Sequence, residues 1–214
     1  MTGSLHVVIA GGSGMIGRAL TAELFALGHR VTVLTRSPRT RVARARAVVW
    51  NPDAGELDLD ALGTVDAIVN LAGYSLSAMP WTATRKRRIL SSRVDATTTI
   101  VGAIARATHK PAVLVNGSAV GYYGSRGGEA LSESHAPGTG FLAEVVQAWE
   151  HAAAGVDPSV RLVIARTGLV IAAEGALTPL RRLARFSLAG PIGSGRQWWP
   201  WISLRDEVKA LIFV

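Results

Sequence analysis

The chain has 214 residues, 49% of them hydrophobic, and no cysteine, so it can build one sizeable core but no disulfide, thiol nucleophile or cysteine-ligated metal site. Its net charge of +8 comes from arginines and a few lysines dispersed along the sequence, which favours a solvated surface or anionic small molecules over nucleic acid. We expect a cytoplasmic protein without a membrane span, because no apolar run is long enough and the first residues lack a secretory signal.

The first predicted element is a buried strand over Leu5–Ala10, followed by a glycine turn and a helix. Two spacings of the turn, GGSGMIG, fit dinucleotide binding: one uses Gly12, Gly14 and Gly17, the other Gly11, Gly14 and Gly17. Glycines let the backbone approach a pyrophosphate closely, and the N-terminus of the helix presents unpaired N–H groups to it. The stretch therefore predicts a dinucleotide site under either spacing.

The second predicted strand, Val31–Thr35, delivers Arg36 to the place where an acidic residue would bind the ribose 2′-hydroxyl of NAD. A guanidinium at that strand end suits a 2′-phosphate, so we prefer NADP over NAD. The alternative is an ordinary surface arginine, since other arginines follow closely.

The later elements alternate between strands and helices. We expect strands at 47–50, 65–71, 111–115 and 161–166, and helices at 82–108, 141–153, from Thr178 and from near Arg205. A long glycine-rich loop after Ser118 is expected to hang over the cofactor, because loops of that length in compact domains are usually functional or disordered. The alternation predicts an α/β fold with a doubly wound parallel sheet.

With these elements placed, the chain resembles an atypical branch of the extended short-chain dehydrogenase/reductases, the nucleoside-diphosphate-sugar epimerase-like proteins. The resemblance rests on segments spread over nearly the whole chain: VVIAGGSGMIG, the Trp-Asn-Pro element at 50–52, VNLAG, WTATRKRRILSSR, GSAVGYYG, the Trp-Glu pair at 149–150, ARTGLVI and GSGRQWWPWISLRDEV. It implies a Rossmann fold of the extended type, with residues 1–170 binding NADP. Residues 171–214 would begin a smaller substrate-binding region that is incomplete here.

The resemblance also implies roles for individual residues. Those implied to hold the pyrophosphate are Gly11, Ser13, Gly14, Met15, Ile16 and Gly17, and Arg36 would take the 2′-phosphate. Those implied to lie along the rest of the cofactor are Leu71, Ala72, Gly73, Arg93, Gly168 and Leu169. Ser118 corresponds to the hydroxyl that hydrogen-bonds the reacting oxygen in active relatives; the alternative for Ser118 is a local hydrogen bond in its turn. The resemblance allows a homodimer.

The chain departs from the family at its proton-transfer groups. Active relatives use a tyrosine four residues before a lysine, and no tyrosine and lysine of this sequence have that spacing. Aligning Glu150 with the acidic residue that follows the pair puts Leu142 and Val146 at the two positions. Tyr122 or Tyr123 is a substitute for the missing phenol, unless both are packing or stacking aromatics.

Other chemistries find little support. The histidines show no metal-ligand spacing, so we expect no metal, and no hydrolase or phosphate-loop motif is present. Arg196 and Gln197 lie among tryptophans, and two interpretations are open. They form a surface that contacts an anionic group and a ring of the substrate, or they belong to a tryptophan-rich edge of the core.

Two functions follow as hypotheses. The first is an NADP(H)-dependent oxidoreductase or epimerase acting on a hydroxyl or carbonyl group of a small, perhaps nucleotide-linked substrate, supported by Ser118. The second is a non-catalytic NADPH sensor or scaffold, supported by the missing tyrosine and lysine.

Overall fold

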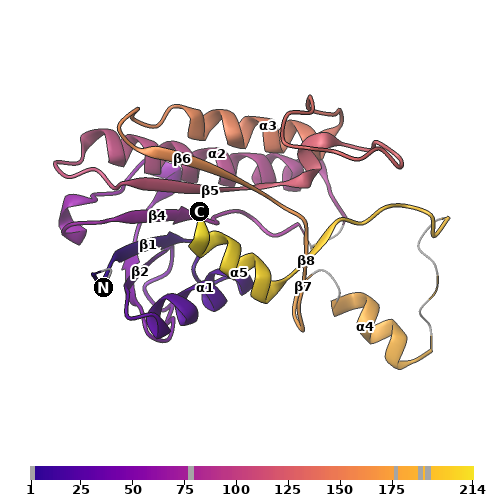
Figure 1. The fold of residues 1–214 in the computed structure, drawn as a ribbon, viewed down its shortest axis with the longest axis horizontal. Helices are drawn as coiled ribbons and strands as arrows, with labels where there is room; N and C mark the ends of the chain where they lie inside the picture. The colour runs from indigo at the N-terminus through magenta and orange to yellow at the C-terminus, as the bar shows by residue number, and fades with distance from the viewer. Residues whose placement is uncertain (1–2, 77–79, 176–177, 188–189, 191–193) are drawn as a thin grey trace.

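The computed structural model describes residues 3–76, 80–175, 178–187, 190 and 194–214. In this part of the chain, six parallel strands form one sheet in the order β3-β2-β1-β4-β5-β6 (Figure 1). Their bounds are β1 His6–Ala10, β2 Arg30–Thr35, β3 Arg46–Val49, β4 Ala67–Asn70, β5 Val113–Ala119 and β6 Arg161–Thr167. This order belongs to a doubly wound sheet, so the predicted fold class is confirmed.

The register of the sheet brings the carboxyl ends of the strands to one edge. Ala10 pairs with both Leu34 and Asn70, and Ser118 pairs with Arg166 on β6. β1 is buried along its whole length, as expected of a β-branched run between two neighbouring strands. In open α/β sheets ligands bind beyond the carboxyl ends, so this edge is where a site is expected.

Four helices of the described part of the chain cover the two faces of the sheet (Figure 1): α1 Met15–Ala26, α2 Ala83–Arg106, α3 Phe141–Ala154 and α5 Leu204–Phe213. A fifth described helix, α4 Thr178–Arg185, lies away from the sheet. α2 and α3 lie against one face, and α1 and α5 against the other. Two begin at side-chain caps: Thr82 accepts a hydrogen bond from the N–H of Arg85, and Ser203 accepts one from the N–H of Asp206.

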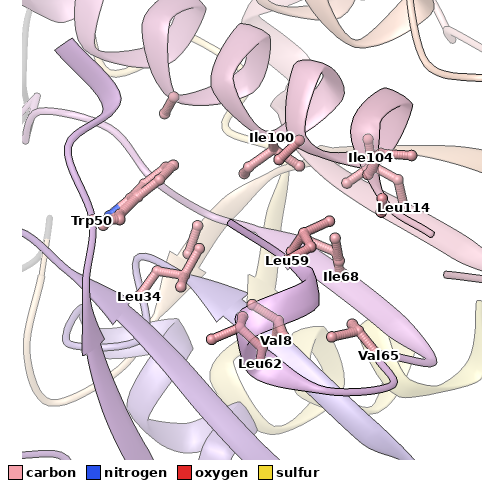
Figure 2. Packing of buried hydrophobic residues seen from close by; sticks show 14 of the residues in the cluster. Val8, Leu34, Trp50, Leu59, Leu62, Val65, Ile68, Ile100, Ile104 and Leu114 are labelled. Carbon is pink, nitrogen blue, oxygen red and sulfur yellow. The ribbon is translucent and has the colours of Figure 1, made fainter. Parts of the chain in front are cut away.

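Each face of the sheet has its own apolar core. Under α2, residues of the sheet such as Val8, Ile68 and Leu114 meet Ile100 and Ile104 of the helix (Figure 2). Under α1 and α5, a second cluster includes Leu20 of α1 and both Val208 and Leu211 of α5. α5 therefore shares the core of the six-stranded sheet.

The structure adds short elements that the sequence patterns did not predict. Three-residue strands β7 Leu169–Ile171 and β8 Trp201–Ser203 pair in parallel, and short 3₁₀ helices lie at Pro52–Ala54, Asp60–Leu62 and Val120–Tyr123. Segments of three or four residues are too short to show a hydrophobic period, which is why they were missed. Among the described residues, no helix is both long and apolar enough to cross a membrane.

Candidate functional site

Three cavities are lined by residues that follow the carboxyl ends of the strands. The glycine cavity, about 320 Å³, is lined by residues that include Gly11, Gly14, Arg36 and Gly73. The central cavity, about 580 Å³, is lined by residues that include Ile16, Ser118, Leu142 and Gly168. The tryptophan cavity, about 700 Å³, is lined by residues that include Tyr123, Arg196, Gln197 and Trp198. Leu71 lines both of the first two, and Val120, Trp198, Trp199 and Pro200 line both of the last two, so the three adjoin in a row.

The glycine turn between β1 and α1 is closed by contacts that only glycines allow. Gly11 has a φ of +81°, and a Cβ there would lie 2.5 Å from the carbonyl oxygen of Leu71. A Cβ on Gly17 would lie 2.5 Å from the carbonyl oxygen of Gly11, and one on Gly12 would lie 2.6 Å from a methyl carbon of Val33. Close packing therefore requires glycine at positions 11, 12 and 17, which belong to the two candidate spacings; Gly14 is less tightly packed.

The same turn leaves the N-terminus of α1 facing the glycine cavity. Gly14 is its N-cap, and no side chain caps it, whereas Ser13 and Gly14 line the cavity. The first N–H groups of a helix have no partner within the helix, so they are available to an anion.

Arg36 follows β2 and lines the glycine cavity together with Ser37 and Thr40. Within the described part of the chain, no carboxylate lies within ion-pair distance of Arg36, whereas Arg18 is paired with Glu174 at 2.6 Å. An exposed guanidinium beside two hydroxyls matches the chemistry of a phosphate.

The remaining residues predicted to hold the cofactor divide between two cavities. Lining the glycine cavity are Gly11, Ser13, Gly14, Arg36, Leu71, Ala72 and Gly73. Lining the central cavity are Ile16, Leu71, Arg93, Gly168 and Leu169. Gly17 is buried in α1, and Met15 starts that helix with its sulfur near Gly175; neither lines a cavity described here.

Arg93 is a half-buried cation on α2. Its Nη1 donates to the backbone carbonyls of Tyr74 at 3.1 Å and Ile89 at 3.0 Å, and its guanidinium lies 5.2 Å from the ring centre of Trp149. Burial lowers the pKa of Arg93 to about 10. A Cβ on Gly73 would lie 2.9 Å from the Arg93 Cζ, so the guanidinium depends on a glycine at that position.

Ser118 sits at the end of β5, where its hydroxyl is fixed by α3 rather than by its own turn. Ser118 Oγ donates to Glu150 Oε1 at 2.5 Å. Glu150 in turn accepts from Arg166, with Nε to Oε1 and Nη2 to Oε2 both at 2.8 Å. The hydrogen bonds to Glu150 hold the pKa of Arg166 above its usual value. Because an ionised carboxylate can only accept hydrogen bonds, the hydroxyl proton of Ser118 points to Glu150. The lone pairs of Ser118 Oγ are therefore available to accept a hydrogen bond from a ligand in the cavity.

The two neighbouring tyrosines both contact Arg166. Arg166 Nη1 donates to the hydroxyl of Tyr123 at 2.9 Å, and its guanidinium lies 3.6 Å from the ring centre of Tyr122. Tyr123 is buried and lines the tryptophan cavity. Tyr122 lines none of the three cavities and packs on the cation.

The two positions that the resemblance aligns with the tyrosine and lysine of active relatives are apolar and line the central cavity. Leu142 and Val146, both on α3, line it, and neither side chain can donate or accept a proton. Where a tyrosine and a lysine are expected, the wall of the central cavity is therefore apolar.

Arg196 and Gln197 line the tryptophan cavity beside Trp198, of which 77% is exposed. Trp199 and Trp201 are also exposed, so their rings are accessible to a ligand.

Sequence reasoning missed the side chains that hold the hydroxyls of the central cavity. Thr167 lines this cavity and donates to Glu207 Oε1 at 2.7 Å, and burial raises the pKa of Glu207. In the sequence, Glu150 is notable only as the acidic residue that follows the expected tyrosine and lysine positions. No sequence spacing indicates its contacts with Ser118 and Arg166. Thr167 belongs to the segment ARTGLVI and Glu207 to the segment WISLRDEV. The sequence predicts a strand in the first and a helix in the second, but it does not predict the hydrogen bond between the two residues. In the described residues, no group of three or more histidines or carboxylates is placed to hold a metal ion.

Comparisons with known proteins agree with this geometry. The model of the "NAD dependent epimerase/dehydratase family" matches residues 7–214. Epimerase family protein ML0860 of Mycobacterium leprae is 44% identical over 210 residues, which are 97% of this chain and 66% of that protein. Epimerase family protein SDR39U1 of Bos taurus is 36% identical over 206 residues, covering 94% of this chain and 67% of its own length.

Solved structures of relatives are also similar. The crystal structure of human epimerase family protein SDR39U1 (isoform 2) with NADPH has a TM-score of 0.87 and 32% identity, over 97% of this chain and 69% of that one. A nucleoside-diphosphate sugar epimerase from Corynebacterium glutamicum has a TM-score of 0.81 and 34% identity, over 98% of this chain and 43% of that one. The chain spans about two thirds of the length of the curated relatives that it matches. It belongs to the NAD dependent epimerase/dehydratase family.

Proposed function

We propose that this chain binds NADP(H) along the row of cavities and exchanges hydride with a hydroxyl or carbonyl group of a small molecule, as an oxidoreductase or epimerase. The human relative's structure contains NADPH, which supports the choice of cofactor. The observation that carries the proposal is the hydroxyl of Ser118, fixed by Glu150 on the wall of a cavity that adjoins the glycine turn.

The glycine turn and Arg36 are the proposed holders of the phosphates. The close packing of Gly11 against Leu71 and of Gly17 against Gly11 keeps the turn compact beside the glycine cavity, and Arg36 has no carboxylate partner among the described residues. Ile16, Leu71 and Gly168 then face the part of the cofactor in the central cavity. When bound, the nicotinamide supplies or takes up the hydride.

Ser118 is the proposed contact of the reacting oxygen, and Tyr123 is the proposed source of a proton. Ser118 Oγ already donates to Glu150, so it is assigned to accept a hydrogen bond from a substrate hydroxyl. Tyr123 accepts from Arg166 and keeps its own proton; because it lines the adjoining tryptophan cavity and not the central one, it is assigned to pass that proton to the oxygen through a water molecule in the reducing direction. Tyr122 would hold the Arg166 guanidinium in place by stacking.

The second candidate function, an NADPH sensor or scaffold without catalysis, is favoured by one observation. Leu142 and Val146 make the cavity wall apolar where a proton-transfer pair is expected. We propose residues 1–170 as the NADP-binding unit and 171–214 as contributing to substrate binding, although α5 packs in the core of the six-stranded sheet. Arg196 and Gln197 are the proposed contacts for the rest of the substrate.

Titration with reduced nucleotides, followed by their fluorescence, tests the proposal. We expect NADPH to bind at least tenfold more tightly than NADH, a difference of about 1.4 kcal/mol. Equal affinities would remove the assignment of Arg36. NADPH consumption with a panel of carbonyl compounds then separates the two functions: turnover supports the oxidoreductase, and tight binding without turnover supports the sensor.

A further inference from the structure

The wall of the central cavity around Ser118 is apolar. α3 contributes Leu142, Val145, Val146 and Trp149, and Leu76 lines the same cavity from the segment between β4 and α2. Trp198, Trp199 and Pro200 continue the apolar lining into the tryptophan cavity. In the proposed function the nicotinamide also occupies this cavity of about 580 Å³, so a small ligand there lies between the ring and the apolar wall, and the adjoining tryptophan cavity of about 700 Å³ can take the rest of it.

The polar side chains of this cavity are few and mostly committed. Among the described lining residues, the hydroxyl of Ser118 is directed to Glu150 and that of Thr167 to Glu207. Arg93 is the one charged side chain in this lining; its Nη1 donates to two backbone carbonyls, and its Nε and Nη2 groups are the donors left for a ligand oxygen. The cavity can therefore hold one or two ligand oxygens but not a ring of hydroxyls.

A sugar ring would bind such a wall poorly. Each hydroxyl that loses water without gaining a partner weakens binding by roughly tenfold or more. An apolar compound incurs no such loss and gains from contact with Leu142 and Val146. The balance favours an apolar body with a single reacting oxygen.

We propose that the substrate that reacts in the central cavity is an apolar carbonyl or hydroxyl compound rather than a polyhydroxylated sugar. Its body lies against Leu142 and Val146, a hydroxyl donates to Ser118 Oγ, and a carbonyl oxygen accepts from Arg93. The inference rests on the proposed function, because it concerns the same site. It differs from the sugar substrates named for solved structures of similar fold, such as UDP-glucose and UDP-glucuronic acid.

Calorimetric titration of the loaded protein tests the inference with two probes. 2-Naphthaldehyde is titrated into the protein saturated with NADP⁺, and UDP-glucose into the protein saturated with NADPH, so that neither complex can react. We expect the aldehyde to bind at least tenfold more tightly than UDP-glucose. Equal affinities, tighter binding of UDP-glucose, or no binding of the aldehyde would overturn the inference.

A matched pair of variants places the aldehyde in the central cavity. Leu142 and Leu90 lie on helices and are each 36% exposed, but of the two only Leu142 lines a cavity described above. Leu142→Gln is expected to weaken binding of the aldehyde at least tenfold, and Leu90→Gln to leave it unchanged. An unchanged affinity in Leu142→Gln would contradict the inference.

A separate NADPH titration of the unmodified chain distinguishes this inference from the proposed function. If NADPH binds and the aldehyde does not, the substrate class is wrong and the cofactor assignment stands. If NADPH does not bind, the proposed function itself fails.

Discussion

Ser118 and Glu150 are 32 residues apart and are joined by a hydrogen bond of 2.5 Å from Ser118 Oγ to Glu150 Oε1. The bidentate contact with Arg166 keeps the carboxylate in place, so the serine hydroxyl has a fixed direction at the cavity wall. A charge-assisted hydrogen bond of this kind is stronger than one between neutral groups, and it orients the group on which the proposed chemistry depends.

Replacement of Ser118 tests whether this hydroxyl takes part in turnover. Ser118→Ala is expected to abolish NADPH-linked turnover and to leave the affinity for NADPH unchanged, because Ser118 is assigned to the reacting oxygen and the phosphates are assigned to the glycine cavity, which Ser118 does not line. Absorbance of NADPH gives the rate and nucleotide fluorescence gives the affinity. Ser91→Ala, at an exposed position of α2, is the control and should keep both. Full turnover in Ser118→Ala would exclude Ser118 from catalysis.

Replacement of Arg36 tests the recognition of the 2′-phosphate. Arg36→Ala is expected to weaken NADPH binding at least tenfold and to leave NADH binding unchanged, because hydrogen bonds to charged groups contribute about 1.5–3 kcal/mol. Arg39→Ala removes an arginine three residues away that does not line the glycine cavity. This control should bind NADPH more tightly than NADH, as we expect of the parent. A retained preference in Arg36→Ala would assign the 2′-phosphate to another group.

The packing of Gly17 predicts a loss of both stability and cofactor affinity on substitution. The Cβ of Gly17→Ala would meet the backbone of the turn at 2.5 Å, so the turn must move. We expect the free energy of unfolding in urea to fall by about 1–3 kcal/mol and NADPH binding to weaken. Gly102→Ala, inside α2, meets only the flexible end of Arg106 at 3.2 Å and should not destabilise the fold. A Gly17→Ala protein as stable as the parent would contradict the reported packing.

The buried His6 predicts a dependence of stability on pH. Its Nδ1 lies 2.8 Å from the carbonyl oxygen of Thr64 and its Nε2 lies 2.8 Å from the hydroxyl of Thr32; burial lowers its pKa. The unfolded chain therefore takes up a proton at higher pH than the folded one. This contribution to stability is complete above about pH 6.5 and is lost as the pH falls toward the pKa of the folded state.

Urea unfolding at a series of pH values measures this contribution. In His6→Gln the free energy of unfolding should fall less steeply than in the parent as the pH is lowered through this range. His109→Gln makes the same substitution at an exposed histidine. This control should show the same dependence of the unfolding free energy on pH as the parent. An identical slope in parent and His6→Gln would contradict the role of His6.

The sequence predicted the six strands, the flanking helices and the glycine turn because long, regular apolar patterns report burial directly. It also identified Ser118 and the loss of the tyrosine and lysine, since both are local features of the chain. The contact between Ser118 and Glu150 joins a strand to a helix, and that between Thr167 and Glu207 spans 40 residues. Such contacts depend on how elements pack, which no local spacing records.

The apolar lining of the central cavity has the same origin. The sequence shows that Leu142 and Val146 stand at the two proton-transfer positions, but not what they face. The position of α3 beside β5 places them in the lining of the central cavity.

A crystal structure of the chain soaked with NADP⁺ would show where the cofactor binds. We expect the 2′-phosphate at Arg36, the pyrophosphate at the glycine turn, and the nicotinamide in the central cavity with Ser118 Oγ facing the ring. A nicotinamide outside the central cavity, or a Ser118 hydroxyl turned away from the ring, would contradict this expectation.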